Sequence, residues 1–105
     1  MKQEDGIIAK RIRESIEVVD SNAQVIIFGS RARGDSRRES DWDILILIEG
    51  PVTTVIERSF RNSLFDLEID TGEVFSTFIY QQKEWDSRHK VTPLYINIKK
   101  EGVRL

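Results

Sequence analysis

The chain has 105 residues, of which 39% are hydrophobic and 32% are charged, a composition typical of one small globular domain. Sixteen basic and 18 acidic residues leave a formal charge of −2, which argues against a protein that coats nucleic acid through a strongly basic surface. Cysteine is absent and His89 is the single histidine, so disulfides, thiolate metal sites, cysteine nucleophiles and histidine-rich metal sites are excluded.

No apolar run approaches the roughly 18 residues that a membrane span needs. No apolar signal core follows the first five residues, Met1 to Asp5. We therefore expect a single domain over residues 1–105, located in the cytoplasm and without a membrane partner. Its chemistry must come from carboxylates, hydroxyls, basic groups and the backbone.

The first half of the chain alternates between helical and extended patterns. Apolar residues recur near a period of 3.6 over residues 5–20, which predicts an amphipathic helix. Residues 25–28 are a β-branched-rich apolar run that stops at Gly29, as a buried strand does. Residues 30–40 are polar and predict a loop or a short helical turn. Residues 43–49 predict a second buried strand.

The second half predicts one longer helix, one strand and two short helices. The longer helix starts after Pro51 and ends at Gly72, which tolerates the left-handed backbone of a helix end. Residues 73–80 are rich in β-branched and aromatic residues and predict a third strand. Short helices are expected over 81–89 and 92–100. This order predicts an α/β or α+β domain, with helices packed on a small three- to four-stranded mixed sheet.

Asp41 and Asp43 stand two positions apart at the start of the second predicted strand. Such residues point to the same face of an extended chain, about 6.5–7 Å apart. Mg²⁺ is commonly held by one or two carboxylates together with water and substrate phosphate oxygens. Two such ions about 3.5–4 Å apart can hold the attacking and leaving oxygens of an in-line displacement. For the acidic pair alone, a solvated strand start is the simpler interpretation.

Gly29 and Ser30 follow the first predicted strand. Glycine lets the backbone approach a ligand closely, and the Ser30 hydroxyl with the N–H groups after it suits a phosphate. Arg31 and Arg33 add planar donors that match phosphate oxygens. A Gly-Ser pair taken alone is most often an ordinary turn.

The Gly-Ser pair and the acidic pair together are a more specific signal of function than either pair alone. Gly29-Ser30, ten intervening residues and then Asp41-Trp42-Asp43 resemble the hallmark of the minimal nucleotidyltransferases of the DNA polymerase β-like superfamily. The loop 31–35 and the closing segment 95–103 are also similar to that family. The resemblance implies a polymerase β-like nucleotidyltransferase fold. It also implies transfer of a nucleoside monophosphate, AMP from ATP, to an acceptor hydroxyl with release of pyrophosphate.

The resemblance also implies a role for each residue of the motif. Asp41 and Asp43 would hold two Mg²⁺ ions, and Gly29 and Ser30 would hold the β- and γ-phosphates of ATP. Arg31 or Arg33 would offset the charge of the leaving pyrophosphate. Such a reaction depends on positioning and charge stabilisation, so the lack of cysteine is no obstacle.

A third carboxylate usually completes this site in the family, as a metal ligand or general base on a later strand. Here the expected position lies near Ser76, and no acid stands there. Glu73, at the start of the third predicted strand, is the candidate for the catalytic role. Asp70, expected in the last turn of the preceding helix, is the second candidate. If neither serves, the domain binds Mg·nucleotide but turns over slowly or not at all.

Two functions therefore stay open at the level of the sequence. The first is a Mg²⁺-dependent nucleotidyltransferase. The second is a catalytically weak or inactive nucleotidyltransferase-like domain that acts as the antitoxin or regulatory partner of a small helical HEPN-type protein, a pairing that the resemblance implies. Such a partner, or a homo-oligomer, would cover exposed apolar surface of a small domain.

Overall fold

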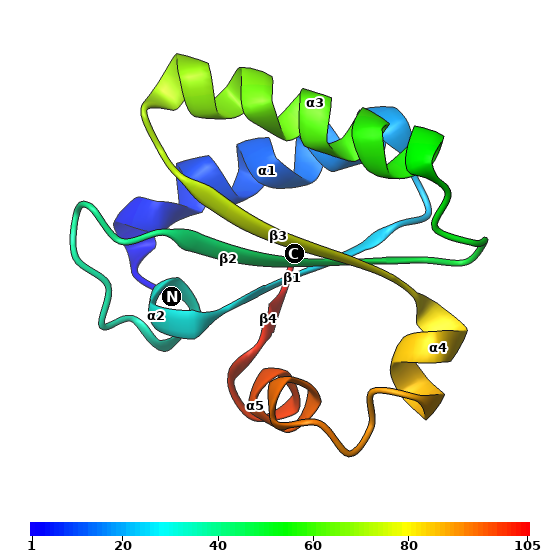
Figure 1. Cartoon of the computed structure of the whole chain (residues 1–105). Coiled ribbons are helices and arrows are strands. Elements are labelled where there is room, and N and C mark those ends of the chain that lie inside the picture. The colour runs from blue at the N-terminus through cyan, green and yellow to red at the C-terminus, as the bar shows by residue number, and fades with distance from the viewer.

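A four-stranded mixed sheet forms the centre of the computed structural model, which describes all 105 residues (Figure 1). Its strands are β1 Gln24–Phe28, β2 Trp42–Ile48, β3 Phe75–Gln81 and β4 Val103–Arg104. They lie in the order β3-β2-β1-β4. β1 is antiparallel to both of its neighbours, whereas β2 and β3 are parallel. The fold is therefore an α+β domain with a mixed sheet, as the sequence predicts.

Helices cover both faces of this sheet (Figure 1). A 3-10 turn η1 Gln3–Asp5 precedes the helices α1 Gly6–Val19, α2 Gly29–Arg33, α3 Thr54–Thr71, α4 Gln82–Ser87 and α5 Pro93–Glu101. The long helices α1 and α3 lie side by side on one face, and α4 and α5 lie on the other. None of these helices is long and apolar enough to cross a membrane.

The two faces of β2 belong to two separate parts of the core. Its even-numbered residues lie in a cluster of 13 buried residues beneath α1 and α3. Its odd-numbered residues Leu45 and Leu47 lie in a cluster of 5 with Trp85 of α4 and Ile98 of α5. Alternate side chains of a strand point to opposite faces, so Asp43 lies on the α4/α5 face.

Every helix and strand expected from the sequence is present, with ends that shift by a few residues. Thr53 begins α3 by accepting a hydrogen bond from the Ile56 N–H at 3.2 Å. Gly72 ends α3 with φ +76°, the left-handed conformation expected there. The strand β4 was not predicted, because two residues carry no pattern of their own.

Three details of packing could not be read from local patterns. β1 and β2 form an antiparallel pair linked by α2 and a loop, with no helical crossover between parallel strands. The apolar side chains of Val55 and Phe65 on α3 are 76% and 56% exposed. His89 is half-buried, with its ring centroid 4.4 Å from that of Tyr80.

Candidate active site

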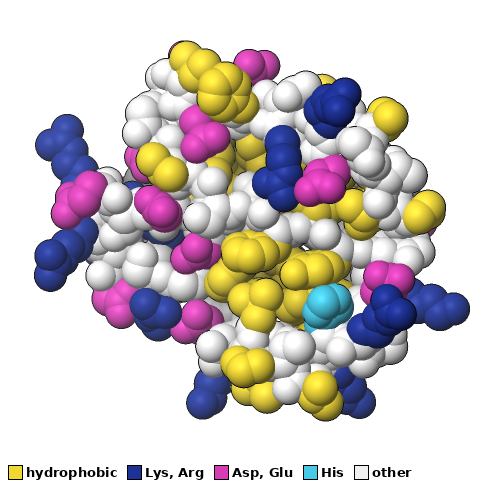
Figure 2. Space-filling view, viewed as in Figure 1, with side chains coloured by type: hydrophobic (Ala, Val, Ile, Leu, Met, Phe, Trp, Pro, Cys, Tyr) yellow, Lys and Arg dark blue, Asp and Glu magenta, His cyan; other side chains and the backbone are white.

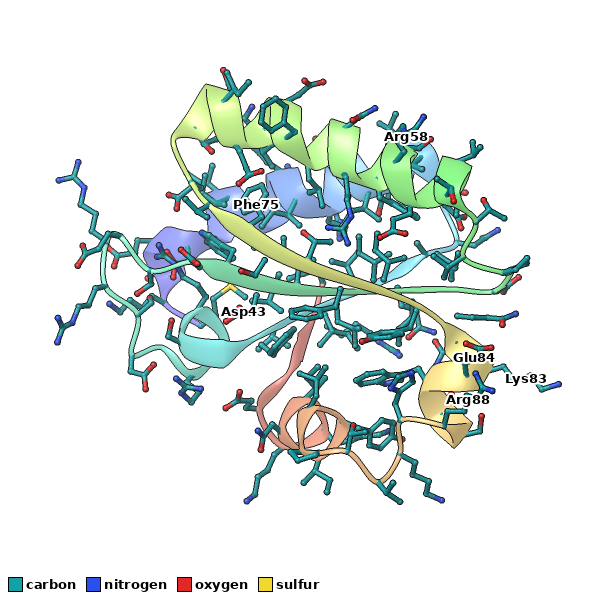
Figure 3. All side chains as sticks on the ribbon, viewed as in Figure 1. Asp43, Arg58, Phe75, Lys83, Glu84 and Arg88 are labelled. Carbon is teal, nitrogen blue, oxygen red and sulfur yellow. The ribbon has the colours of Figure 1, made fainter.

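The turn from β1 into α2 brings Gly29 against Asp43. Phe28 pairs with Asp43 across the antiparallel strands, so the next residue along the chain meets the Asp43 side chain. Gly29 has φ +72°, and a Cβ at this position would overlap Asp43 Oδ2. Figure 3 shows Asp43 beneath the sheet, next to α2. Only glycine adopts this positive φ without strain and, having no Cβ, avoids overlap with the Asp43 carboxylate.

The carboxylate of Asp43 is half-buried, and Asp41 lies exposed two residues before it. Burial raises the pKa of Asp43, and the charges of Asp41 and Glu101 raise it further, whereas Arg33 opposes the shift. The ionised pair is therefore unfavourable without a positive charge nearby. Oxygen ligands held in this way fit a hard divalent cation such as Mg²⁺.

Ser30 and Arg33 lie beside this pair on α2. Ser30 is half-buried, and its hydroxyl makes no hydrogen bond within the chain. The exposed Arg33 donates through Nε to Asp35 at 3.2 Å and through Nη1 to Glu101 at 3.2 Å. Its hydrogen bonds to these two carboxylates raise the pKa of Arg33, so the guanidinium stays charged. These residues lie where the sequence predicted phosphate contacts.

Arg31 lies on the same helix as Arg33, but its side chain is buried. Its side chain is only 6% exposed, and Nη1 donates to Asp5 Oδ1 at 3.0 Å. Nη2 donates to the carbonyls of Arg38 and Ser40, and the guanidinium lies 5.0 Å from the ring centroid of Trp42. These contacts hold the loop that carries Asp41. They leave the nucleotide-binding role expected for Arg31 without support.

Glu73 is likewise engaged away from Asp43. Its Oε2 accepts a hydrogen bond from Trp42 Nε1 at 3.2 Å and lies 3.5 Å from Arg31 Nη2. Trp42 belongs to the α1/α3 side of the sheet, whereas Asp43 lies on the other face. The structure therefore does not bring Glu73 to the carboxylate pair, and the catalytic role expected for it finds no support in this geometry.

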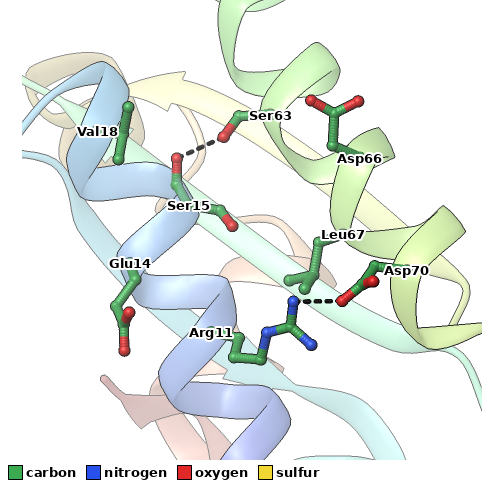
Figure 4. A pocket seen from close by; sticks show the side chains of 8 residues that line it. All are labelled: Arg11, Glu14, Ser15, Val18, Ser63, Asp66, Leu67 and Asp70. Carbon is green, nitrogen blue, oxygen red and sulfur yellow. Dashed lines mark hydrogen bonds and ion pairs between the residues drawn. The ribbon is translucent and has the colours of Figure 1, made fainter.

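Asp70, the other candidate for the third carboxylate, forms an ion pair with Arg11 of α1 at 2.5 Å. Figure 4 shows this pair in a polar groove of about 590 Å³ between α1 and α3. In the same groove, the Ser63 hydroxyl donates to the carbonyl of Ser15 at 2.7 Å. These contacts tie α1 to α3 on the face of the sheet opposite to Asp43.

Ser76 occupies the place where the sequence led us to expect a third acid. It lies directly across from Asp43 in the parallel register of β2 and β3, so both side chains share the α4/α5 face. No group of three or more acidic or histidine side chains in the chain is arranged to hold a metal ion. The strands β2 and β3 thus bring no third carboxylate to the pair, and a serine stands across from Asp43.

Glu101, the last residue of α5, also reaches this site and was not predicted. Its Oε1 accepts a hydrogen bond from the Gly29 N–H at 3.2 Å, across 72 residues of sequence. It also accepts from Arg33. A negative charge at the C-terminal end of a helix is unfavourable, because it lies at the negative end of the helix dipole. The acidic residue at the end of the last predicted helix was the one signal in the sequence that Glu101 is held by a contact elsewhere in the fold.

An apolar surface lies on the same face as the site. Figure 2 shows it between acidic side chains and the single histidine. Half-buried aromatic and aliphatic residues next to the smaller core cluster form part of this side of the sheet, namely Ile26, Phe78, Tyr80, Leu94 and Tyr95. The carboxylate pair therefore lies next to an apolar part of the surface.

Comparison with known proteins identifies a family and several similar structures, two of which are described here. The family described as nucleotidyltransferase domain matches residues 8–105. No curated protein matches the chain. A chain in the crystal structure of a toxin-antitoxin with AMP-PNP superposes with a TM-score of 0.65 at 17% identity, covering 90% of this chain and 69% of that one.

The second structure is that of a protein described as a candidate nucleotidyltransferase. It superposes with a TM-score of 0.53 at 22% identity, covering 93% of this chain and 97% of that one. At these identities the two structures show a shared fold. They agree with the α+β architecture and mixed sheet described above.

Proposed function

The chain belongs to the nucleotidyltransferase domain family, and we propose that it transfers a nucleoside monophosphate, AMP from ATP, to an acceptor hydroxyl and releases pyrophosphate. The observation that carries this proposal is the half-buried Asp43 carboxylate packed against the left-handed Gly29, with Asp41 two residues away. The proposal rests on this acidic pair beside a glycine turn whose backbone N–H group is a hydrogen-bond donor.

In this proposal Asp41 and Asp43 hold two Mg²⁺ ions. When bound, these ions supply positive charge to the reacting phosphate and to the leaving oxygens. Burial and the charges of Asp41 and Glu101 raise the pKa of Asp43, so a bound cation would offset the negative charge that gathers at this site. The donor set therefore fits Mg²⁺.

The phosphate contacts come from α2. Gly29 brings its backbone close to the ligand, and the unpaired Ser30 hydroxyl is a donor for the β- and γ-phosphates. Arg33 is exposed on the same helix and offsets the charge of the leaving pyrophosphate. Arg31 acts through the loop that it holds, by fixing the position from which Asp41 enters the site.

The acceptor hydroxyl must lose a proton during the transfer. Ser76 lies across from Asp43, so β3 supplies no carboxylate to take it, and Glu101 is engaged with Gly29 and Arg33. We therefore expect nucleotide binding with slow turnover.

A second function has its own supporting observations. We propose as the alternative that the domain binds nucleotide with little or no catalysis, as the antitoxin or regulatory partner of a small helical HEPN-type protein. The missing third carboxylate supports it, as does the shared fold with a chain from a toxin-antitoxin structure. Exposed apolar side chains such as Val18 and Ile69 leave surface for a partner or for a homo-oligomer.

Calorimetric titration of Mg·ATP tests the nucleotide site. The wild type is expected to bind only when Mg²⁺ is present, and Asp43→Asn is expected to bind at least tenfold more weakly. Asp70→Asn is the matched control, because Asp70 pairs with Arg11 between α1 and α3, and it is expected to bind like the wild type. No binding by the wild type at millimolar Mg·ATP would reject the nucleotide site.

Labelling separates the two functions. Incubation with ATP that is labelled on the α-phosphate, in a cell lysate, should transfer label to an acceptor if the domain is an enzyme. Binding of Mg·ATP without transfer, together with a helical protein that co-purifies with the chain, would support the alternative.

A further inference from the structure

Glu101 holds two donors that the proposed function assigns to the nucleotide. Its carboxylate accepts from the Gly29 N–H at 3.2 Å and from Arg33 Nη1 at 3.2 and 3.4 Å. Its side chain is 23% exposed, so solvent and ligands reach it. The inference below rests on the proposed function and concerns the same site.

A carboxylate and a phosphate compete for donors of this kind. A backbone N–H has one hydrogen, and an acceptor already in line with it blocks the approach of another. The guanidinium of arginine binds carboxylates and phosphates alike, because both are anionic and their oxygens match its planar set of N–H donors. Arg33 is also held by Asp35, so it has little capacity left for a further anion.

Charge adds to this competition. Asp41 and Asp43 lie at the same site, and Glu101 is close enough to contribute to the electrostatic environment of Asp43. A triphosphate that bound with Glu101 in place would meet three carboxylates and the single nearby cation Arg33. Moving the Glu101 carboxylate away removes one negative charge and frees two donors at once.

The attachment of Glu101 permits this movement. It is the last residue of α5, and the chain continues into β4, which pairs with the edge of β1 through two residues (Figure 1). A glutamate side chain rotates about its own bonds, so the carboxylate can leave Gly29 while Ile98 keeps α5 anchored in the core.

We propose that Glu101 is a specificity-determining residue that occupies the phosphate donors of the empty site, and that the triphosphate of a Mg·nucleotide displaces it. Glu101 then sets a threshold, because a ligand must bring enough phosphate charge to replace it on Gly29 and Arg33. Nucleoside triphosphates meet this threshold, and nucleoside monophosphates do not.

The test measures binding of Mg·ATP and of inorganic Mg·triphosphate by Glu101→Gln and Glu101→Ala. Both variants are expected to bind both probes more tightly than the wild type, by about tenfold, because one charge-assisted competitor is lost. The gain should be equal for the two probes, since Glu101 faces the phosphates. Asp35→Asn is the matched control: it removes the Asp35 charge from Arg33 but leaves Glu101 on both Arg33 and Gly29, so its gain should be smaller.

Thermal melts show whether each variant is folded, and Glu101→Gln keeps the side-chain volume if Glu101→Ala does not fold. Wild-type binding with unchanged or weaker binding by both folded variants would overturn the inference and leave the proposed function standing. Tighter binding of both probes by the folded Glu101 variants than by the wild type would support the inference. If none of the proteins binds either probe, both proposals fail.

Discussion

The half-buried position of Asp43 lowers the stability of the fold when its carboxylate is ionised. Its carboxylate is half-buried against Gly29, and its pKa is raised first by burial and then by the charge of Asp41. The folded chain therefore holds the proton more tightly than the unfolded chain does. As pH rises through the raised pKa, the native state loses its proton and stability falls, because the ionised group is less favourable in the fold than in water.

Asp43→Asn should consequently stabilise the chain at neutral pH. Solvent screening keeps the gain modest, on the order of 0.5–1 kcal/mol. Urea denaturation at pH 7, without divalent cations, measures it, and the difference should shrink when pH falls below the ordinary pKa of aspartate. Mg²⁺ should stabilise the wild type more than the variant. A variant that is less stable than the wild type at pH 7 would contradict this account.

Some residues of the candidate site could be predicted from their spacing in the sequence, and others could not. The acidic pair and Gly29-Ser30 could be predicted, because each lies at the end of an apolar strand and the strand ends are visible in the sequence. The roles of Arg31 and Glu73 could not, because their partners depend on packing: Arg31 pairs with Asp5 across 26 residues of sequence. A charged side chain looks the same in sequence whether it is solvated or buried.

At the scale of elements, the buried pair of Arg31 and Asp5 joins α2 to the N-terminal turn η1. Both residues are buried, at 5% and 7% exposure, and Ser36 is buried next to them. Arg31 also holds the loop before β2 through the carbonyls of Arg38 and Ser40. One guanidinium therefore connects α2 to the loop that follows it and to the N-terminal turn, which lies 26 residues earlier in the chain.

Arg31→Ala should lower the free energy of unfolding by about 3–5 kcal/mol, because it leaves the Asp5 carboxylate buried without a partner. Urea denaturation measures the loss. Arg33→Ala is the control, since this arginine lies on the same helix but is exposed, and its stability should stay close to that of the wild type. The double variant Asp5→Asn with Arg31→Ala should recover part of the loss. Equal stability of the two arginine variants would show that the buried pair is unimportant.

At the scale of the whole molecule, the two sides of the sheet are unequal. The α1/α3 side contains a cluster of 13 buried residues, whereas the α4/α5 side contains 5. Local opening is easiest where few apolar contacts hold an element. The candidate site therefore lies on the side that the core holds less firmly, which suits a site that must exchange ligands.

Amide hydrogen exchange should follow this difference. The amides of β2 should exchange slowest, since this strand is central and almost fully buried, and those of α4 and α5 should exchange faster than those of α1 and α3. Two-dimensional NMR of the exchanging chain measures these rates residue by residue. Protection in α5 equal to that in α1 would show that the fold opens as a single unit.

Local patterns in the sequence determined the class of fold, the order of the helices and strands, and the position of the acidic pair. They suffice because helix periodicity, apolar strands and end signals such as Thr53 and Gly72 act over a few neighbouring residues. The family motif adds the ten-residue spacing between Ser30 and Asp41, which is itself a local property.

Only the tertiary structure decided which charged groups meet. It turned β1 and β2 antiparallel, placed Ser76 beside Asp43, engaged Glu73 and Arg31 elsewhere, and brought Glu101 to Gly29. The physical reason is that a carboxylate or a guanidinium gains its function from partners that chain topology brings close, and residues 72 positions apart carry no local record of that contact.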